Sequence, residues 1–110
     1  MAASHVMYII LRRDLLKEPL SWPIGAVATQ AAHAATAALW TWREDAETTA
    51  YMADMDHMHK VTLGVDSEAE LLATRDRLTA KVEDDMPVAI ALKPYTKDAV
   101  KAALRPYKLF

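Results

Sequence analysis

The sequence has no cysteine, only two glycines and only three serines, and each shortage removes a class of chemistry. Without cysteine the chain has no disulfide, no thiolate nucleophile and no cysteine-ligated zinc site. Gly25 and Gly64 are too few for a phosphate-binding P-loop or a dinucleotide-binding fingerprint. No serine lies in a nucleophile-elbow motif. A hydrolase with this sequence is therefore expected to activate water through a general base.

Long apolar runs are also missing. The most apolar long stretch, residues 24–42, is mostly alanine and contains Gln30 and His33, whereas a membrane-spanning helix needs about 20 predominantly apolar residues. Residues 1–5 show no basic stretch followed by an apolar run. We expect a cytoplasmic protein without a membrane partner. It is expected to form a single domain over residues 1–110, because domains commonly have about 100–150 residues.

Strands and helices are predicted to alternate along the chain. Strands are expected at residues 6–12, 59–65 and 88–93 and a weak one at 81–83, and helices at 23–42, 46–55, 67–80 and 97–104. This β-α-α-β-α-β-β-α order predicts an α/β domain with a mostly parallel sheet covered on both faces. Three helix starts carry capping signals: Pro23 in the first turn after Ser21 or Trp22 as the cap, Ser67 with Glu70 in a capping box, and Thr96 as the cap of the last helix.

Gln30 and His33 form a polar pair on the alanine-rich helix. They are three residues apart and share a face with Ala26. A buried polar pair needs hydrogen-bond partners. The pair is therefore either a functional site at the exposed edge of the helix or a satisfied pair at the sheet boundary.

Residues 56–59 offer Asp56, His57 and His59 as possible metal ligands. An H-x-H pair needs a third ligand at a defined place, and none is evident. Solvated histidines are the favoured interpretation, and no metal is expected. Lys60 follows at a strand end, where ligands often meet α/β sheets, although an ordinary solvated lysine is the alternative.

The tail is basic although the chain has a net charge of -2. From residue 93 to 110 a single acid, Asp98, faces five basic residues: Lys93, Lys97, Lys101, Arg105 and Lys108. Three of them recur every fourth residue and so share one helix face. Such a stripe can bind phosphates, or it can be the solvated outer face of a surface helix.

Five stretches, taken in order, resemble one family: residues 13–15 (RDL), 25–34 (GAVATQAAHA), 58–61 (MHKV), 91–95 (ALKPY) and 107–110 (YKLF). They are similar to the type II peptidyl-tRNA hydrolases, and closest to the eukaryotic peptidyl-tRNA hydrolase domain-containing subfamily. The resemblance spans nearly the whole chain. It implies a four-stranded mixed sheet with helices on both faces, a peptidyl-tRNA substrate rather than DNA, no cofactor and a possible homodimer.

The resemblance also implies site positions. Gln30, His33 and Lys60 fall on them, with Asp14 beside them. Two departures stand out. Ala26 replaces the lysine that follows the helix glycine in the family. The stretch before the last long strand is also short, so that Asp84, or Glu83 beside it, is the candidate for the family's acid in the loop.

These observations give a first hypothesis of ester hydrolysis by activated water. His33 or Asp84 would activate the water, while Gln30 and Lys60 would orient the substrate and stabilise negative charge in the same water-accessible cleft. The substrate would be bound by Asp14, Gly25, Lys93, Lys97, Lys101 and Arg105. A non-catalytic module that binds tRNA or protein is the second hypothesis. A protein-interaction domain anchored by Trp22, Trp40 and Trp42 is the third.

Overall fold

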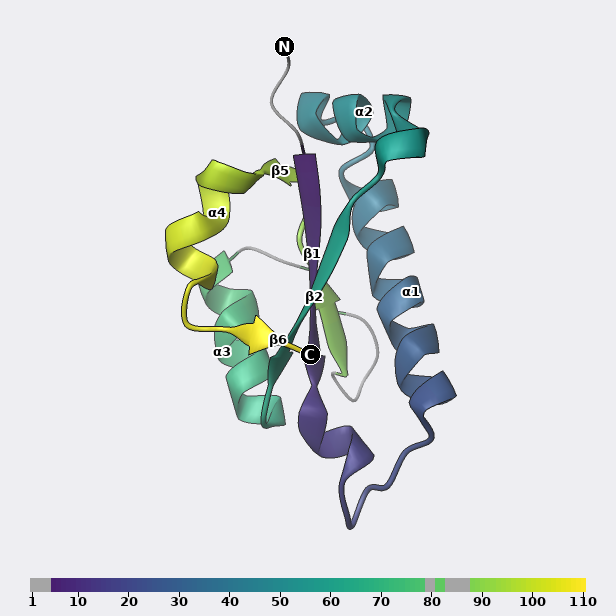
Figure 1. Ribbon diagram of the computed structural model, residues 1–110, viewed down its shortest axis with the longest axis vertical. Coiled ribbons are helices and arrows are strands. Elements are labelled where there is room, and N and C mark those ends of the chain that lie inside the picture. Colours follow the sequence, from purple (N-terminus) through teal and green to yellow (C-terminus); the bar gives the residue numbers. More distant parts are fainter. Residues whose placement is uncertain (1–4, 79–80, 83–87) are drawn as a thin grey trace.

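The computed structural model describes residues 5–78, 81–82 and 88–110, with the backbone alone at 81–82 and 97–99. Its sheet has the strand order β3-β4-β1-β2-β6, and the short strand β5 pairs with the start of β1. The strands are β1 (His5–Arg12), β2 (Lys60–Val65), β3 (Lys81–Val82), β4 (Ala89–Ala91), β5 (Tyr95–Thr96) and β6 (Lys108–Leu109). The long strand β1 therefore lies in the middle of the sheet (Figure 1).

The sheet is mixed. β1 runs parallel to β2 from the pair Met7 and Lys60 to the pair Arg12 and Val65, and antiparallel to β4. The mixed sheet is confirmed, but the expectation of a mostly parallel sheet is wrong, because the described pairs other than β1 with β2 are antiparallel. The expected count of four strands is also too low. The two additional strands, β5 and β6, have two residues each, which is too short for an alternating pattern to reveal them.

Helices cover both faces of the sheet. They are α1 (Ile24–Thr41), α2 (Ala46–Ala53), α3 (Glu68–Leu78) and α4 (Lys97–Leu104). Two short 3-10 turns, Arg13–Leu16 and Met55–His57, follow β1 and α2. α1 and α2 lie on one face and α3 and α4 on the other (Figure 1). None of the helices in the described part is both long and apolar enough for a membrane span.

Each face of the sheet has its own core because successive side chains of a strand point to opposite sides. Met7, Ile9 and Leu11 pack with α1 and α2. Ile10 of the same strand packs in the other cluster, with the buried leucines of α3 and α4. α1 turns Val27 and three alanines towards the sheet: Ala34, Ala35 and Ala38. These small side chains allow the helix to approach the strands closely.

The helix starts differ in part from the sequence predictions. Pro23 is itself the N-cap of α1, with φ -62° and ψ 145°, so the expected cap at Ser21 or Trp22 is wrong. The serine half of the capping box is confirmed, because the Glu70 N–H donates to Ser67 Oγ at 3.1 Å, whereas the Glu70 carboxylate accepts from the Asp66 N–H at 2.6 Å. Thr96 occupies the N-cap position of α4, although its side chain makes no capping hydrogen bond.

Candidate functional site

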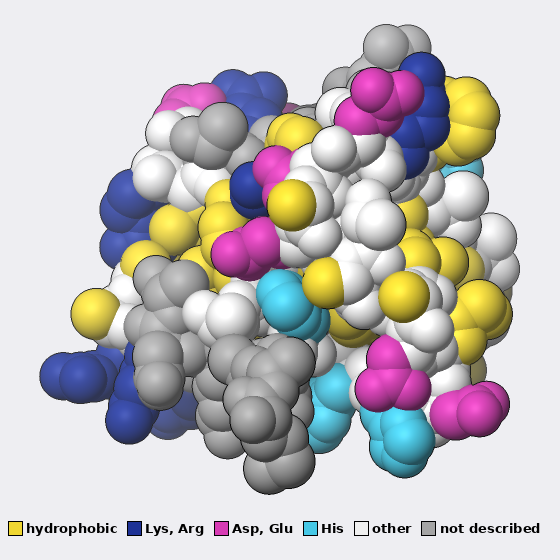
Figure 2. All heavy atoms as spheres, turned by 90° about the horizontal axis from the view of Figure 1, so that it is seen from above, with side chains coloured by type: hydrophobic (Ala, Val, Ile, Leu, Met, Phe, Trp, Pro, Cys, Tyr) yellow, Lys and Arg dark blue, Asp and Glu magenta, His cyan; other side chains and the backbone are white. Residues whose placement is uncertain are grey.

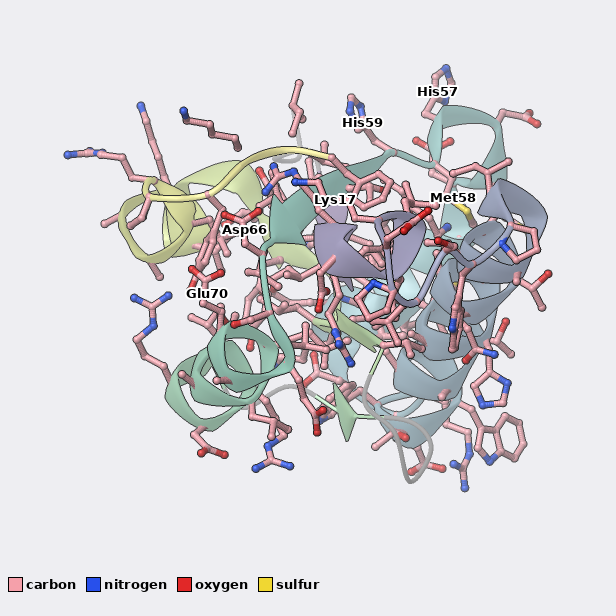
Figure 3. All side chains as sticks on the ribbon, turned by 90° about the horizontal axis from the view of Figure 1, so that it is seen from below. Lys17, His57, Met58, His59, Asp66 and Glu70 are labelled. Atoms are coloured by element: carbon pink, nitrogen blue, oxygen red, sulfur yellow. The ribbon has the colours of Figure 1, made fainter. Side chains whose placement is uncertain are left out.

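The carboxyl ends of β1 and β2 form the edge of the sheet at which ligands of α/β proteins commonly bind. The chain leaves β1 through the 3-10 turn Arg13–Leu16 and returns through a loop to the start of α1 at this end (Figure 1). α3 starts here as well, directly after β2. Figure 3 looks onto this end, where Lys17 lies near the middle and Asp66 and Glu70 lie together beside α3.

A partly buried ion pair occupies the end of β1. The guanidinium of Arg12, which is 4% exposed, donates to both carboxylate oxygens of Asp14, at 3.0 and 2.8 Å. Glu68 Oε2 lies 3.7 Å from the same guanidinium. Hydrogen bonds from Arg12 hold the pKa of the Asp14 carboxyl below its usual value. Asp14 thus lies at the carboxyl end of β1, but as an ionised, engaged carboxylate it is poorly suited to accept a proton.

Arg13 ties the C-terminal strand to the same edge, which the sequence did not suggest. Its guanidinium donates to the carbonyl oxygens of Lys108 and Leu109, at 3.2 and 3.0 Å, and lies 3.4 Å from Asp66. A Cβ atom on Gly64 would collide with this guanidinium. The glycine within β2 was the signal for this close approach.

The N-terminus of α1 is open. The N–H groups of Ala26 and Val27 bond to the Pro23 carbonyl. Within the described residues no side chain caps the helix, and the first turn holds no acid. Ile24 and Gly25 are exposed, and a Cβ on Gly25 would meet no atom within 4 Å. Free N–H groups at the positive end of a helix suit an anion.

Gln30 and His33 lie further along α1, on the face they share with Ala26. His33 is exposed, whereas Gln30 is half-buried. Gln30 Oε1 is a buried acceptor that has no hydrogen-bond partner among the described residues. α1 lies mainly over β4, β1 and β3. Among the described residues, the interpretation as a satisfied polar pair therefore does not hold for the Gln30 oxygen.

The contacts that Lys60 makes among the described residues are with other side chains, so they do not support the three-residue cleft expected from the sequence. Lys60 begins β2, on the other side of β1 from β4, and it pairs with Met7 near the start of β1. Its ammonium donates to the Tyr51 hydroxyl at 3.1 Å and lies 2.8 Å from the sulfur of Met58. Burial lowers the pKa of this ammonium. Strand order, which local sequence does not specify, puts Lys60 on the other side of β1 from the strand that α1 covers most.

Only some of the five basic residues of the tail lie together on one exposed surface. Lys101 of α4, Arg105 directly after it and Lys108 of β6 are exposed. Figure 2 shows Lys and Arg side chains projecting on the side of the molecule where α4 lies. Lys93 does not extend this patch. It is bound to Asp45, the N-cap of α2, at 2.6 Å. The side chain of Lys97 lies outside the described residues.

The remaining candidates are less informative. The acid expected at Asp84 or Glu83 lies outside the described residues. His57 Nδ1 lies 2.8 Å from Asp54, and this hydrogen bond raises the pKa of the His57 ring. In the part of the chain that the structure describes, no three His, Asp or Glu residues gather as a metal site would require. Trp22 and Trp42 pack against the core, whereas Trp40 is exposed.

Comparison with known proteins supplies the family. The model of the peptidyl-tRNA hydrolase PTH2 family matches residues 5–110. A human protein named "Putative peptidyl-tRNA hydrolase PTRHD1" is 40% identical over 114 residues, covering 96% of this chain and 81% of the relative. The mouse protein of the same name is 39% identical over the same shares. Both alignments are longer than the 110 residues of this chain, so the relatives contain residues without a counterpart here. The chain belongs to the peptidyl-tRNA hydrolase PTH2 family.

Proposed function

We propose that this protein hydrolyses the ester between a peptide and the 3′ end of a tRNA, on the face of α1 that carries Gln30 and His33. Family membership supports the general activity. The buried Gln30 Oε1, without a partner among the described residues, supports the location. A buried acceptor without a partner costs about 1–3 kcal/mol. A substrate donor that reaches this oxygen when the side chain moves on binding, such as a ribose hydroxyl, would remove this cost.

His33 acts as the general base in this proposal. It takes a proton from a water molecule, whose oxygen then bonds to the ester carbonyl carbon. When the tetrahedral intermediate collapses, the bond from this carbon to the ribose oxygen breaks and the ribose oxygen takes the proton from His33. Gln30 holds the ribose in place. The products are a peptide acid and a tRNA with a free hydroxyl.

The N-terminus of α1 is proposed to bind the phosphate of the terminal nucleotide. The exposed Ile24 and Gly25 N–H groups are available because no side chain of the described residues caps the helix. Gly25 lies five residues before Gln30, or about 7.5 Å along the helix axis at about 1.5 Å per residue. One nucleotide can bridge this spacing between a phosphate and an ester.

Phosphates further from the ester are assigned to Lys101, Arg105 and Lys108, which are exposed. α4 lies on the face of the sheet opposite to α1 (Figure 1). A tRNA that contacts both must therefore pass around an edge of the sheet. The carboxyl edge, where Lys17 is exposed, is the shorter route from the start of α1.

The proposal is tested with an N-acetylated aminoacyl-tRNA, by measuring release of the labelled amino acid. His33→Ala and Gln30→Ala are each expected to lower kcat/KM about a hundred- to thousandfold. Lys60→Ala is the control, because Lys60 binds Tyr51 and Met58 instead. Thermal unfolding would verify that each variant folds.

Near wild-type hydrolysis by both α1 variants would reject this site. If Lys60→Ala lowers kcat/KM as much as His33→Ala does, the three-residue cleft expected from the sequence is supported instead.

A module that binds tRNA without cleaving it is the second candidate. It is favoured by Ala26, which stands where the family has a lysine, and by Asp14, whose two oxygens are already engaged by Arg12. The same assay separates the two functions, because the module would bind the tRNA and leave the ester intact. The cytoplasmic location and the homodimer stay predictions.

A further inference from the structure

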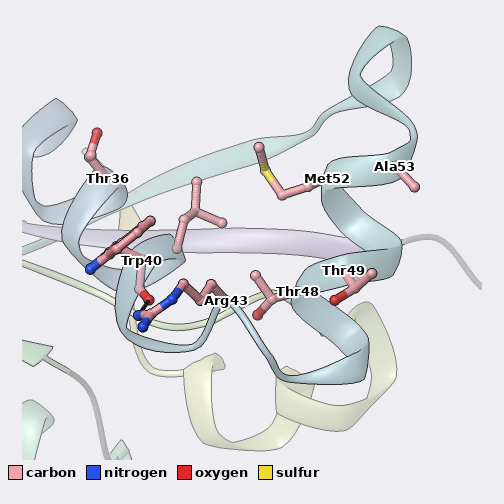
Figure 4. Close-up of a pocket in the computed structure, with 8 residues that line it drawn as sticks. Thr36, Trp40, Arg43, Thr48, Thr49, Met52 and Ala53 are labelled. Atoms are coloured by element: carbon pink, nitrogen blue, oxygen red, sulfur yellow. Dashed lines mark hydrogen bonds between the residues drawn. The ribbon is translucent and has the colours of Figure 1, made fainter.

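A pocket of about 630 Å³ opens between the C-terminal part of α1 and α2 (Figure 4). Its size is within the range of about 300–1,000 Å³ that is usual for ligand sites. One wall comes from α1 and the turn after it, and the other from α2. Thr36, Trp40 and Arg43 line the first wall, and Met52 lines the second.

The walls of this pocket are mostly apolar, and on the α1 side Arg43 stacks on Trp40. Trp40 is 67% exposed. The guanidinium of Arg43 lies 4.1 Å from the centre of its ring and donates to the Trp40 carbonyl at 2.8 Å. Met52 of α2 is 36% exposed and faces the pocket from the other side (Figure 4). An indole stacked on a guanidinium, opposite a flexible methionine, suits an apolar side chain of variable shape.

The pocket continues the helix face that carries His33. Thr36 and Trp40 lie three and seven residues after His33 in α1, so the three positions share one side of the helix. At about 1.5 Å per residue, Thr36 is about 4.5 Å and Trp40 about 10.5 Å further along the axis. The pocket thus lies beyond His33, in the direction away from the open N-terminus of α1.

We infer that this pocket binds the side chain of the peptide residue that precedes the esterified one. The inference rests on the proposed function, which places the ester at His33 and the tRNA towards the start of α1. The preceding residue then lies one Cα spacing, about 3.8 Å, further along, and its side chain reaches Trp40 and Met52. The preferred substrates are peptidyl-tRNAs with an apolar or aromatic residue at this place.

The test uses N-acetyl-dipeptidyl-tRNAs with one tRNA and an esterified alanine, in which the preceding residue is Phe, Leu, Gly or Asp. Wild-type kcat/KM is expected to be about tenfold or more higher for Phe and Leu than for Gly and Asp. Trp40→Ala and Met52→Ala should each reduce this preference several-fold without slowing hydrolysis of the Gly substrate, because the ester itself is bound elsewhere.

Met55→Ala is the matched control. Met55 is 64% exposed and lies three residues after Met52, but it does not line the pocket, so the preference should stay at the wild-type value. Equal rates for the four substrates, or an unchanged preference in both pocket variants, would overturn the inference and leave the proposed function intact. No hydrolysis of any of the four would overturn both.

Discussion

Arg12 and Asp14 are joined by two hydrogen bonds, one to each carboxylate oxygen, at 3.0 and 2.8 Å. This geometry keeps the carboxylate ionised and both oxygens occupied. Asp14 therefore contributes to this edge of the sheet chiefly by holding the buried Arg12. Proton transfer in the proposed reaction is assigned to α1.

Asp14→Asn is expected to lower the free energy of unfolding by about 1.5–3 kcal/mol, because Arg12 loses its bidentate charged partner. Urea denaturation measures this change. Asp66→Asn is the control. The Asp66 side chain is 74% exposed and lies 3.4 Å from Arg13, so its loss should cost less than about 0.5 kcal/mol. Equal losses in the two variants would contradict the assignment.

The stabilisation by Asp14 should depend on pH. The pKa of Asp14 is lowered in the folded protein, so the unfolded chain binds this proton more readily. The stabilisation is therefore complete above the unfolded pKa, about 3.9, and is lost as the pH falls through the lower folded pKa. The gap in unfolding free energy between wild type and Asp14→Asn should shrink below about pH 4. A gap that stays constant in urea titrations at lower pH would refute this.

Gly64→Ala is expected to displace the Arg13 guanidinium, which a Cβ at this position would meet. The lost hydrogen bonds to Lys108 and Leu109 should cost about 1–2 kcal/mol. Amide hydrogen exchange should show reduced protection in β6. Gly25→Ala is the matched control, because its Cβ would meet no atom within 4 Å, and it should leave stability unchanged or raise it by up to about 1 kcal/mol. Unchanged exchange in β6 after Gly64→Ala would disprove the role of Arg13.

Affinity for tRNA should fall steeply with salt if exposed basic residues contact phosphates. The double replacement of Lys101 and Arg105 by alanine should reduce the magnitude of the slope of log affinity against log salt concentration by about 1–2. Lys93→Ala is the control, because Lys93 is bound to Asp45, and its slope should match that of the wild type. The same slope in the wild type and in both variants would exclude Lys101 and Arg105 from tRNA binding.

Local sequence determined the elements that depend on neighbouring residues. The apolar run of β1, the capping box of Ser67 and Glu70 and the whole extent of α4 were predictable from it. These features follow from backbone preferences and hydrogen bonds within a few residues. The position of Asp14 at the end of β1 and the shared face of Gln30 and His33 were predictable for the same reason.

Only the tertiary structure decided which distant residues meet. β1 lies between β4 and β2. This order places Lys60 on the other side of β1 from β4, the strand that α1 covers most. Lys93 is bound to Asp45, 48 residues away in the chain. The apolar pocket between α1 and α2 exists only because the turn after α1 brings Met52 opposite Trp40. Contacts between residues so far apart in the chain depend on how whole faces of helices and sheets pack, so a local pattern of residues does not predict them.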